Sequence, residues 1–209
     1  MSELVVLRHG RTAANAKGLL LGRLDVPLDP LGEAQAAALA AAVRGRLSAT
    51  GAELVAVVSS PLARTRATAA ALGQPVVVDE RFVEVDYGDF DGRALADVPP
   101  EVWRAWREDP AFRPPGGETL QEVADRVDGA CAEWAEHAER EAGPGGVVVV
   151  VTHVSPLKAA VAWAMGLGPD SSWRTHVDPA SITRIRVSGG GRVLCSFNET
   201  GHLAGVSGA

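Results

Sequence analysis

The sequence has few cysteines, and neither of them belongs to a recognisable motif. Cys131 and Cys195 are far apart and form no CxxC pair, so neither a zinc knuckle nor a redox-active dithiol is indicated. Neither is followed six positions later by arginine, as a cysteine-based phosphatase requires. We expect both to be small core residues. A chain of 209 residues can bury that core without disulfides or a structural metal.

The sequence also lacks a long apolar segment and an excess of positive charge. The valine run 147–151 is far too short to span a bilayer, and the first residues lack the basic and apolar regions of a secretory signal. The formal net charge of −6 argues against a general binder of nucleic acid or acidic membranes. We therefore expect a cytoplasmic protein with no nucleic-acid or membrane partner.

Strand and helix patterns alternate along most of the chain. This alternation predicts an α/β fold, a single domain over residues 1–209 built as a three-layer sandwich: a mostly parallel central sheet flanked by helices on both faces. The strands are expected at 4–7, 54–59, 76–78 and 147–152, with a hairpin of 182–187 and 193–197 joined through Gly189, Gly190 and Gly191. The helices are expected from Asp29-Pro30, Ser60-Pro61, Glu118 and Ser155-Pro156 onward.

The segment 93–117 combines aromatic residues with arginines and prolines. It is rich in proline and arginine and is expected to form a helical turn or two plus loop, which suggests a lid. Its aromatic residues indicate apolar contact with a substrate, and its arginines could meet a second anion. These residues are Trp103, Trp106 and Phe112, and Arg104, Arg107 and Arg113.

Two of the predicted buried strands end on a histidine. The first brings Arg8 and His9 to Gly10, which permits a sharp turn, and the strand 147–152 ends on His153. Ligand sites in open α/β sheets form at the carboxyl ends of strands. We therefore expect the two histidines to share one pocket.

Cationic and amide side chains accompany the histidines at these strand ends. Ser60 as a helix cap and Pro61 at the first helical position would place Arg64 in the first turn, near the positive end of the helix dipole. The guanidinium groups of Arg8 and Arg64, together with the amide of Asn15, suit a tetrahedral dianion. The pattern predicts a phosphate pocket.

The chemistry of such a pocket follows from its histidines and a nearby acid. A neutral histidine can take a phosphoryl group covalently, and a second, protonated histidine would stabilise the charge that develops. The departing alkoxide needs a proton, for which Glu84 is the candidate donor. Asp86 and Asp89 lie close in sequence and remain alternative acids.

Six motifs in a fixed order resemble those of the histidine phosphatase superfamily, also called phosphoglycerate mutase-like. They are LRHGRTAAN, GRLDVPLDPLGEAQA, SSPLARTRATA, EVDYGDFDG, PGGETL and VTHVSP. The resemblance implies that His9 is phosphorylated and that Glu84 is the proton donor, with no metal or organic cofactor. The residues implied or proposed to bind the phosphoryl group are Arg8, Asn15, Gly22, Arg64 and His153.

The sequence departs from the family at one position of the site. Many members have glycine directly after the second histidine, where this chain has Val154. A β-branched residue does not readily adopt a positive φ, so we expect the turn here to differ from the usual one. The string VTHVSPLK is similar to an acid phosphatase branch found in actinobacteria.

Phosphatase and mutase chemistry share the same phosphohistidine and differ in what attacks it. The glycolytic mutases of the family usually carry a longer, basic insertion after the glutamate motif, whereas this chain has only the segment 93–117. We therefore expect an acid-phosphatase-like hydrolase acting on a small-molecule phosphomonoester. The alternatives are mutase-type phosphoryl transfer and a non-catalytic phosphate-binding relative, and the sequence leaves open a homodimer.

Overall fold

A six-stranded sheet forms the centre of the protein. The computed structural model describes residues 1–189 and 191–206. The strands run in the order β3-β2-β4-β1-β5-β6 across the sheet; β1 to β4 pair in parallel, and β5 is antiparallel to both of its neighbours. The strands are β1 (Ser2–Arg8), β2 (Glu53–Ser59), β3 (Val76–Val78), β4 (Gly146–Thr152), β5 (Ile182–Ser188) and β6 (Gly191–Glu199).

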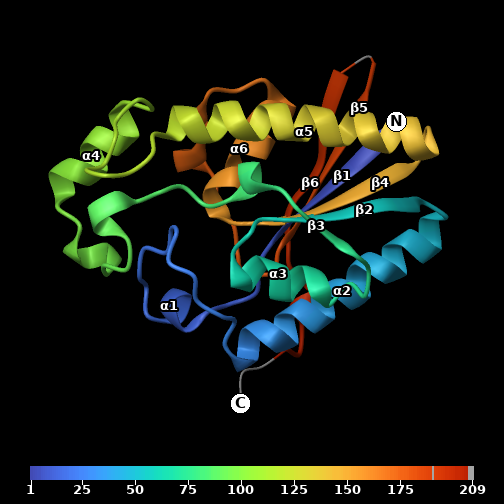
Figure 1. Ribbon diagram of the computed structural model, residues 1–209, viewed down its shortest axis with the longest axis horizontal. Helices are drawn as coiled ribbons and strands as arrows, with labels where there is room; N and C mark the ends of the chain where they lie inside the picture. The colour runs from blue at the N-terminus through green and yellow to red at the C-terminus, as the bar shows by residue number, and fades with distance from the viewer. Residues whose placement is uncertain (190, 207–209) are drawn as a thin grey trace.

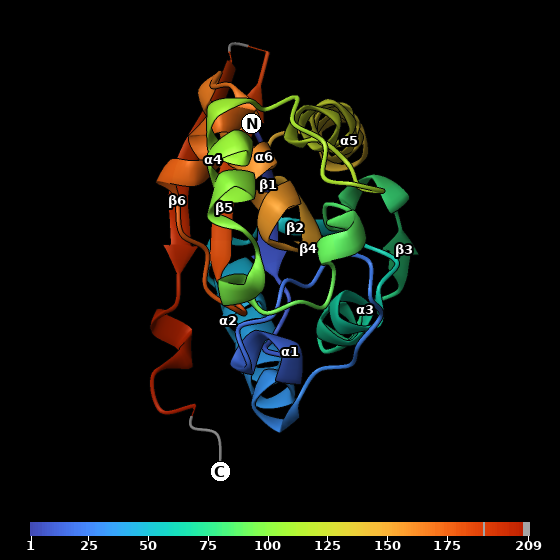
Figure 2. The ribbon, with the colours of Figure 1, turned by 90° about the vertical axis from the view of Figure 1, so that its left-hand side faces the viewer.

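Helices cover both faces of the sheet, which confirms the predicted three-layer sandwich (Figure 1). One face packs against α5 and α6, and the other against α2 and α3. The short helices α1 and α4 lie beyond the end of the sheet that faces the viewer in Figure 2. The helices are α1 (Ala13–Ala16), α2 (Pro30–Thr50), α3 (Ala63–Ala70), α4 (Pro100–Glu108), α5 (Leu120–Ala142) and α6 (Val154–Met165).

The central strand β4 explains why the valine run is continuous and not alternating. Its side chains point to both faces in turn: Val148 packs with Leu157 of α6, and Val149 packs with Leu39 of α2. Every residue of β4 is buried. A parallel strand covered on both faces has no position that favours a polar residue.

The register of β1 and β4 brings the two strand-end histidines together. These strands are parallel neighbours, and Arg8 pairs with Thr152. His9 and His153 are the next residues of the two strands, so they leave the sheet at the same level. The backbone N–H of His9 also donates to the carbonyl of Thr152 at 3.0 Å. The closeness of the two histidines expected from the sequence therefore follows from strand pairing.

Gly10 follows His9 but is required for a reason other than a sharp turn. It does not adopt a positive φ, so the conformation itself is open to other residues. A Cβ at this position would instead overlap the carbonyl oxygen of Gly32 in the first turn of α2. The Gly10 N–H donates to Thr68 Oγ1 at 3.1 Å. The glycine therefore permits the close approach of two backbone segments.

Gly10→Ala is expected to lower the free energy of unfolding by about 1–3 kcal/mol, because the added methyl group forces two backbone segments apart. Urea unfolding followed by circular dichroism measures this change. Gly45→Ala is the matched control, since a Cβ at Gly45 of α2 meets no neighbouring atom. That substitution should stabilise the protein by roughly 0.5–1 kcal/mol. Equal effects of the two substitutions would refute the close-approach explanation.

Two helices begin differently from the prediction. The predicted cap of α3 by Ser60 is wrong, because α3 begins at Ala63 and the Ala63 N–H is bound by the Asp25 carboxylate at 2.6 Å. The Ser60 hydroxyl contacts His153 instead. Arg64 still lies in the first turn, as expected. The helix α6 begins at Val154 with His153 as its N-cap, slightly before the predicted start.

Of the two cysteines, one lies in the core as predicted and the other does not, and the predicted hairpin is present. Cys131 is buried on α5, as predicted, and burial raises the pKa of its thiol. The core placement of Cys195 is wrong, because this residue lies partly exposed on the outermost strand β6. The antiparallel pairing of β5 and β6 confirms the hairpin. Residue 190 of its predicted connection lies outside the described residues.

Candidate active site

His9 lies at the carboxyl end of β1 and is 3% exposed. Its Nδ1 is 2.7 Å from the carbonyl oxygen of Gly10, so Nδ1 carries the proton and donates it. A neutral imidazole has one donor and one acceptor nitrogen, which leaves a lone pair on Nε2. Burial and the charges of Arg8 and Arg64 hold the pKa of His9 well below its ordinary value. His9 is therefore neutral, with Nε2 in the nucleophilic form.

His153 is fully buried, and its ring centroid lies 5.1 Å from that of His9. Its Nδ1 accepts from Arg64 Nε at 3.2 Å, and its Nε2 lies 2.7 Å from Ser60 Oγ. Burial, followed by the charge of Arg64, lowers the pKa of His153 well below the usual range. The expected protonated His153 is thus not the state favoured here, because Nδ1 must keep its lone pair to accept from Arg64.

Arg64 is buried and is held from several sides. Its Nη1 donates to the carbonyl of Leu24 at 2.8 Å and its Nη2 to the carbonyl of Gly22 at 2.7 Å. Asp91 in turn accepts the backbone N–H groups of residues 22, 23 and 24 at 2.8, 2.8 and 2.9 Å. Three of the five guanidinium N–H groups are bound in this way, which fixes the direction of the two that remain for an anion.

Arg8 supplies a second guanidinium beside the histidines. Its Nη1 donates to the carbonyl of Val177 at 2.6 Å. Its Nε is buried and has no hydrogen-bond partner among the described residues. Burial lowers the pKa of Arg8 to about 10, so the group stays cationic at neutral pH. A bound anion would satisfy this buried donor, which otherwise carries a desolvation cost.

Glu84 is 3% exposed and lies against the first residues of α6. Its Oε1 accepts from the backbone N–H groups of Val85 at 2.8 Å and Ser155 at 3.1 Å. Its Oε2 accepts from the N–H of Val154 at 3.0 Å, which leaves one lone pair on this oxygen for a proton. The carboxyl group is therefore fixed in place and can still exchange a proton through Oε2.

The two alternative acids lie in different surroundings. Asp86 accepts the backbone N–H of Gly88 at 2.8 Å and so closes a local turn. Asp89 is exposed. Among the three carboxylates, only Glu84 is both buried and bonded to the residues that follow His153. This arrangement favours Glu84 as the proton donor.

Val154 does not produce the expected change in the turn. It is the first residue of α6 and has no positive φ, so a β-branched side chain is compatible with its backbone. Its N–H remains available and binds Glu84. The departure from glycine therefore leaves the local geometry of the site intact.

Asn15 and Gly22 are the remaining candidates for binding phosphate, and only Asn15 has a hydrogen-bond donor left for an anion. Asn15 Oδ1 accepts from the backbone and hydroxyl of Thr12 in a capping box, so only its amide NH2 can face an anion. Asn15 bonds to neither histidine. The Gly22 N–H is already bound by Asp91, and the Gly22 carbonyl holds Arg64. Gly22 thus contributes through Arg64, and its one hydrogen-bond donor is not available for phosphate.

Sequence reasoning missed residues that hold this site in place. Ser60 bonds to His153, and Asp91 orders the loop that binds Arg64. Both lie within the recognised motifs SSPLARTRATA and EVDYGDFDG, which was the available signal. Their roles depend on contacts between segments far apart in sequence, so spacing alone could not assign them.

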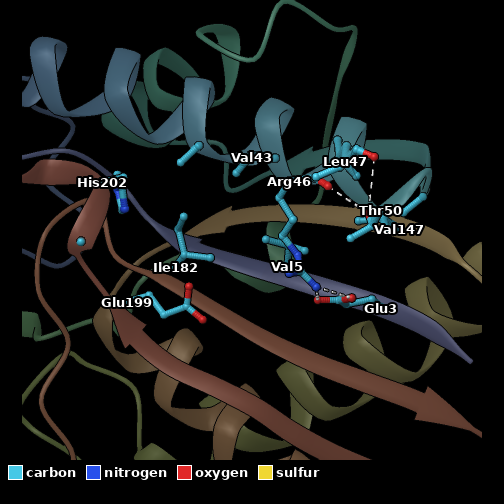
Figure 3. A pocket seen from close by; sticks show the side chains of 14 residues that line it. Glu3, Val5, Val43, Arg46, Leu47, Thr50, Val147, Ile182, Glu199 and His202 are labelled. Carbon is cyan, nitrogen blue, oxygen red and sulfur yellow. Dashed lines mark hydrogen bonds and ion pairs between the residues drawn. The ribbon is translucent and has the colours of Figure 1, made fainter.

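A cavity of about 390 Å³ lies between α2 and the sheet, away from the candidate site (Figure 3). Its charged groups are engaged with one another: Arg46 bonds to both carboxylate oxygens of Glu3 at 3.0 and 3.2 Å. His202 lies 2.9 Å from the carbonyl of Ala180. None of the candidate site residues lines this cavity. This cavity is therefore separate from the candidate phosphate site.

Neither a metal-binding cluster nor a membrane-spanning helix is found in the described part of the chain. No cluster of three or more histidine, cysteine, aspartate or glutamate side chains there is arranged to hold a metal ion. No helix within residues 1–189 and 191–206 combines the length and apolarity needed to cross a membrane.

The two neutral histidines predict a loss of stability on acidification. In the unfolded chain they take up protons below about pH 6.5, whereas the folded protein holds His9 and His153 neutral. The unfolded state then binds more protons. The free energy of unfolding therefore decreases by about 1.4 kcal/mol for each unit by which the pH is lowered and for each histidine. Urea unfolding at about pH 7.5, 6 and 5 measures this slope.

A substitution assigns the slope to the buried rings. His153→Gln should reduce it by about 1.4 kcal/mol per pH unit between about pH 6.5 and 5, because one proton-binding difference is lost. His176→Gln is the control, since His176 is 81% exposed. A slope that responds equally to both substitutions would contradict the assignment.

Comparisons with known proteins place this constellation in a family. The family model described as histidine phosphatase superfamily (branch 1) matches residues 4–200. A bifunctional protein of Mycobacterium tuberculosis is 35% identical over 210 residues, which is 97% of this chain and 55% of that protein. The chain thus spans about half the length of this relative.

Two further relatives match over most of both chains. A glucosyl-3-phosphoglycerate phosphatase of Mycolicibacterium vanbaalenii is 37% identical over 196 residues, 90% of this chain and 84% of that protein. The solved structure of a mycobacterial glucosyl-3-phosphoglycerate phosphatase in complex with VO3 has a TM-score of 0.84 at 30% identity and covers 95% of this chain and 99% of that one. With the family model matched from strand β1 to the end of β6, this chain belongs to the histidine phosphatase superfamily.

Proposed function

We propose that the protein hydrolyses small phosphomonoesters through a phosphohistidine on His9. The observation that carries this proposal is the state of His9: its Nδ1 proton is held by the Gly10 carbonyl, and its free Nε2 lies in the field of Arg8 and Arg64. A neutral nucleophile surrounded by cations suits attack on a dianion. The related proteins named as phosphatases support the same reaction.

In the first step, the Nε2 lone pair of His9 forms a bond to phosphorus and the bond from phosphorus to the ester oxygen breaks. The ester oxygen keeps the bonding electrons and takes the proton of Glu84, so that the leaving group departs as an alcohol. Arg8 and Arg64 neutralise the charge on the transferred oxygens. Neutral His153 acts mainly by orienting Arg64 through its Nδ1.

In the second step, water attacks the phosphorus of phospho-His9. Glu84, now ionised, takes a proton from that water, the bond between phosphorus and Nε2 breaks, and inorganic phosphate leaves. The backbone N–H groups of Val154 and Ser155 stabilise the carboxylate between the steps. Glu84 thus returns to its protonated form and His9 to its neutral form.

Hydrolysis and mutase transfer are distinguished by their products. With 3-phosphoglycerate as the test ester, hydrolysis yields inorganic phosphate and glycerate, whereas transfer yields 2-phosphoglycerate. We expect phosphate release to exceed isomerisation by at least about tenfold, because water competes for the phosphohistidine unless a site excludes it. Parallel assays of phosphate and of 2-phosphoglycerate measure the ratio. A dominant isomerisation would replace the hydrolase proposal with mutase activity.

A further inference from the structure

A second cavity, of about 190 Å³, adjoins the active site and has an aromatic wall. Three tryptophans line it, two from α4 and one from the segment before β5. The rings of Trp103 and Trp106 stack at 5.8 Å, and Trp173 meets Trp103 edge-on at 6.2 Å. Since a cavity of roughly 150 Å³ accommodates benzene, this one has room for a ring with a short substituent.

The cavity borders the residues that hold the candidate proton donor. Val154 and Ser155 line it, and the backbone N–H groups of these two residues hold the carboxylate of Glu84. The group that receives the Glu84 proton is the ester oxygen, so the alcohol part of the substrate must lie on this side of the site. The aromatic cavity is therefore where the alcohol would be accommodated.

Two of the residues that line the cavity, Trp106 and Lys158, have N–H groups left for a ligand. Trp106 is 1% exposed, and its indole N–H has no hydrogen-bond partner among the described residues. A buried donor without a partner carries a desolvation cost that a ligand oxygen would remove. Lys158 also lines the cavity; its Nζ donates to the carbonyl of Ser172 at 2.8 Å, which leaves two of its N–H groups for a ligand.

The arginines of the segment 93–117 are less well placed than Lys158. Arg107 lies over the ring of Trp173 at 5.6 Å from its centroid. Arg113 bonds to Glu122 at 2.5 Å and is 53% exposed. Neither of these arginines, nor Arg104, lines the cavity. Lys158 is therefore the cation that an anionic group of the alcohol would meet.

We propose that this cavity selects phosphomonoesters whose alcohol carries an apolar or aromatic ring with a carboxylate substituent: the ring against Trp103 and Trp106, the carboxylate accepting from Lys158 and the Trp106 N–H. The inference rests on the hydrolase function proposed above. It assigns Trp106 and Lys158 as specificity residues and gives the segment 93–117 the role of the wall that contacts the alcohol.

Three esters with alcohols of similar acidity test the selection. Ethyl phosphate has no ring, benzyl phosphate adds the ring, and 4-carboxybenzyl phosphate adds the carboxylate. We expect kcat/KM to rise by at least about tenfold at each addition, as burial of a ring and one charge-assisted contact allow. Because kcat/KM reports the step in which the alcohol leaves, ratios between esters cancel effects on later steps.

Two conservative variants assign the preference to particular groups. Lys158→Met keeps the apolar stem and Trp106→Phe keeps an aromatic ring, and each should reduce the preference for 4-carboxybenzyl over benzyl phosphate by about fivefold to tenfold. Lys17→Met and Trp134→Phe are the controls, because Lys17 is exposed and the Trp134 indole bonds to Asp79, away from the cavity. Both controls should keep the wild-type ratios.

The outcomes separate this inference from the function on which it rests. Equal hydrolysis of all three esters, abolished by His9→Ala, would overturn the selection and leave the hydrolase function standing. A preference for 4-carboxybenzyl over benzyl phosphate that Lys158→Met and Trp106→Phe leave unchanged would also overturn the assignment of these residues. If the protein hydrolyses none of the esters and no other phosphomonoester, the hydrolase function fails and the inference fails with it.

Discussion

His9→Ala is expected to lower kcat/KM for phosphomonoester hydrolysis by about 10⁵-fold, the scale of losing a covalent nucleophile. The variant removes the Nε2 lone pair that would carry the phosphoryl group, and no other imidazole nitrogen replaces it, because the neutral His153 uses both ring nitrogens to hold Arg64 and Ser60. Phosphate release under single-turnover conditions measures the residual rate.

The same variant should still bind the reaction product. Arg8 and Arg64 are held by backbone carbonyls and not by His9, so the Kd of inorganic phosphate should stay within about tenfold of the wild-type value. His176→Ala is the matched control and should keep full activity, since that ring is exposed. Turnover by a folded His9→Ala protein above about one hundredth of the wild-type rate would rule out the covalent role.

Glu84→Gln is expected to slow the hydrolysis of alkyl esters far more than that of 4-nitrophenyl phosphate. An alkoxide needs a proton in order to leave, and loss of a general acid costs about 10²–10⁴-fold. The 4-nitrophenolate anion leaves without a proton, so its kcat/KM should fall by less than about tenfold. The ratio of kcat/KM for ethyl phosphate and 4-nitrophenyl phosphate is the measurement.

The leaving-group ratio is needed because the substitution also affects the local structure. A glutamine amide would place N–H groups against backbone donors that now bind the Glu84 oxygens, so some loss of stability is expected. Such a loss affects both esters equally and cancels in the ratio. Asp86→Asn and Asp89→Asn test the alternative acids and should leave the ratio unchanged. A selective effect at either aspartate would move the acid role there.

The fold could be predicted from sequence because its strands are buried on both faces. The continuous valines of β4 and the apolar run of β1 identify central parallel strands, and the parallel register then places His9 beside His153. Helix starts were less predictable. Ser60-Pro61 has the composition of a helix start, yet the first backbone N–H of α3, that of Ala63, is bound by Asp25, a residue distant in sequence. The helix propensities of neighbouring residues carry no information about such a distant hydrogen-bond partner.

The residues of the candidate site could be predicted from the sequence, but their protonation states could not. The residue types at the strand ends identify a phosphate pocket, but the charge of His153 depends on which nitrogen Arg64 contacts. Likewise, the role of Gly22 depends on Asp91 having already bound its N–H. These are properties of contacts between segments, and only the three-dimensional arrangement specifies them.

The covalent role of His9 is the central claim, and trapping the intermediate tests it most directly. The protein would be mixed with excess phosphomonoester, quenched in alkali within milliseconds to preserve phosphohistidine, and digested for mass spectrometry. We predict one phosphoryl group on His9, formed at a rate at least equal to turnover and absent from His9→Ala. Turnover without any phosphorylated histidine, or with the phosphoryl group on another residue, would contradict the account.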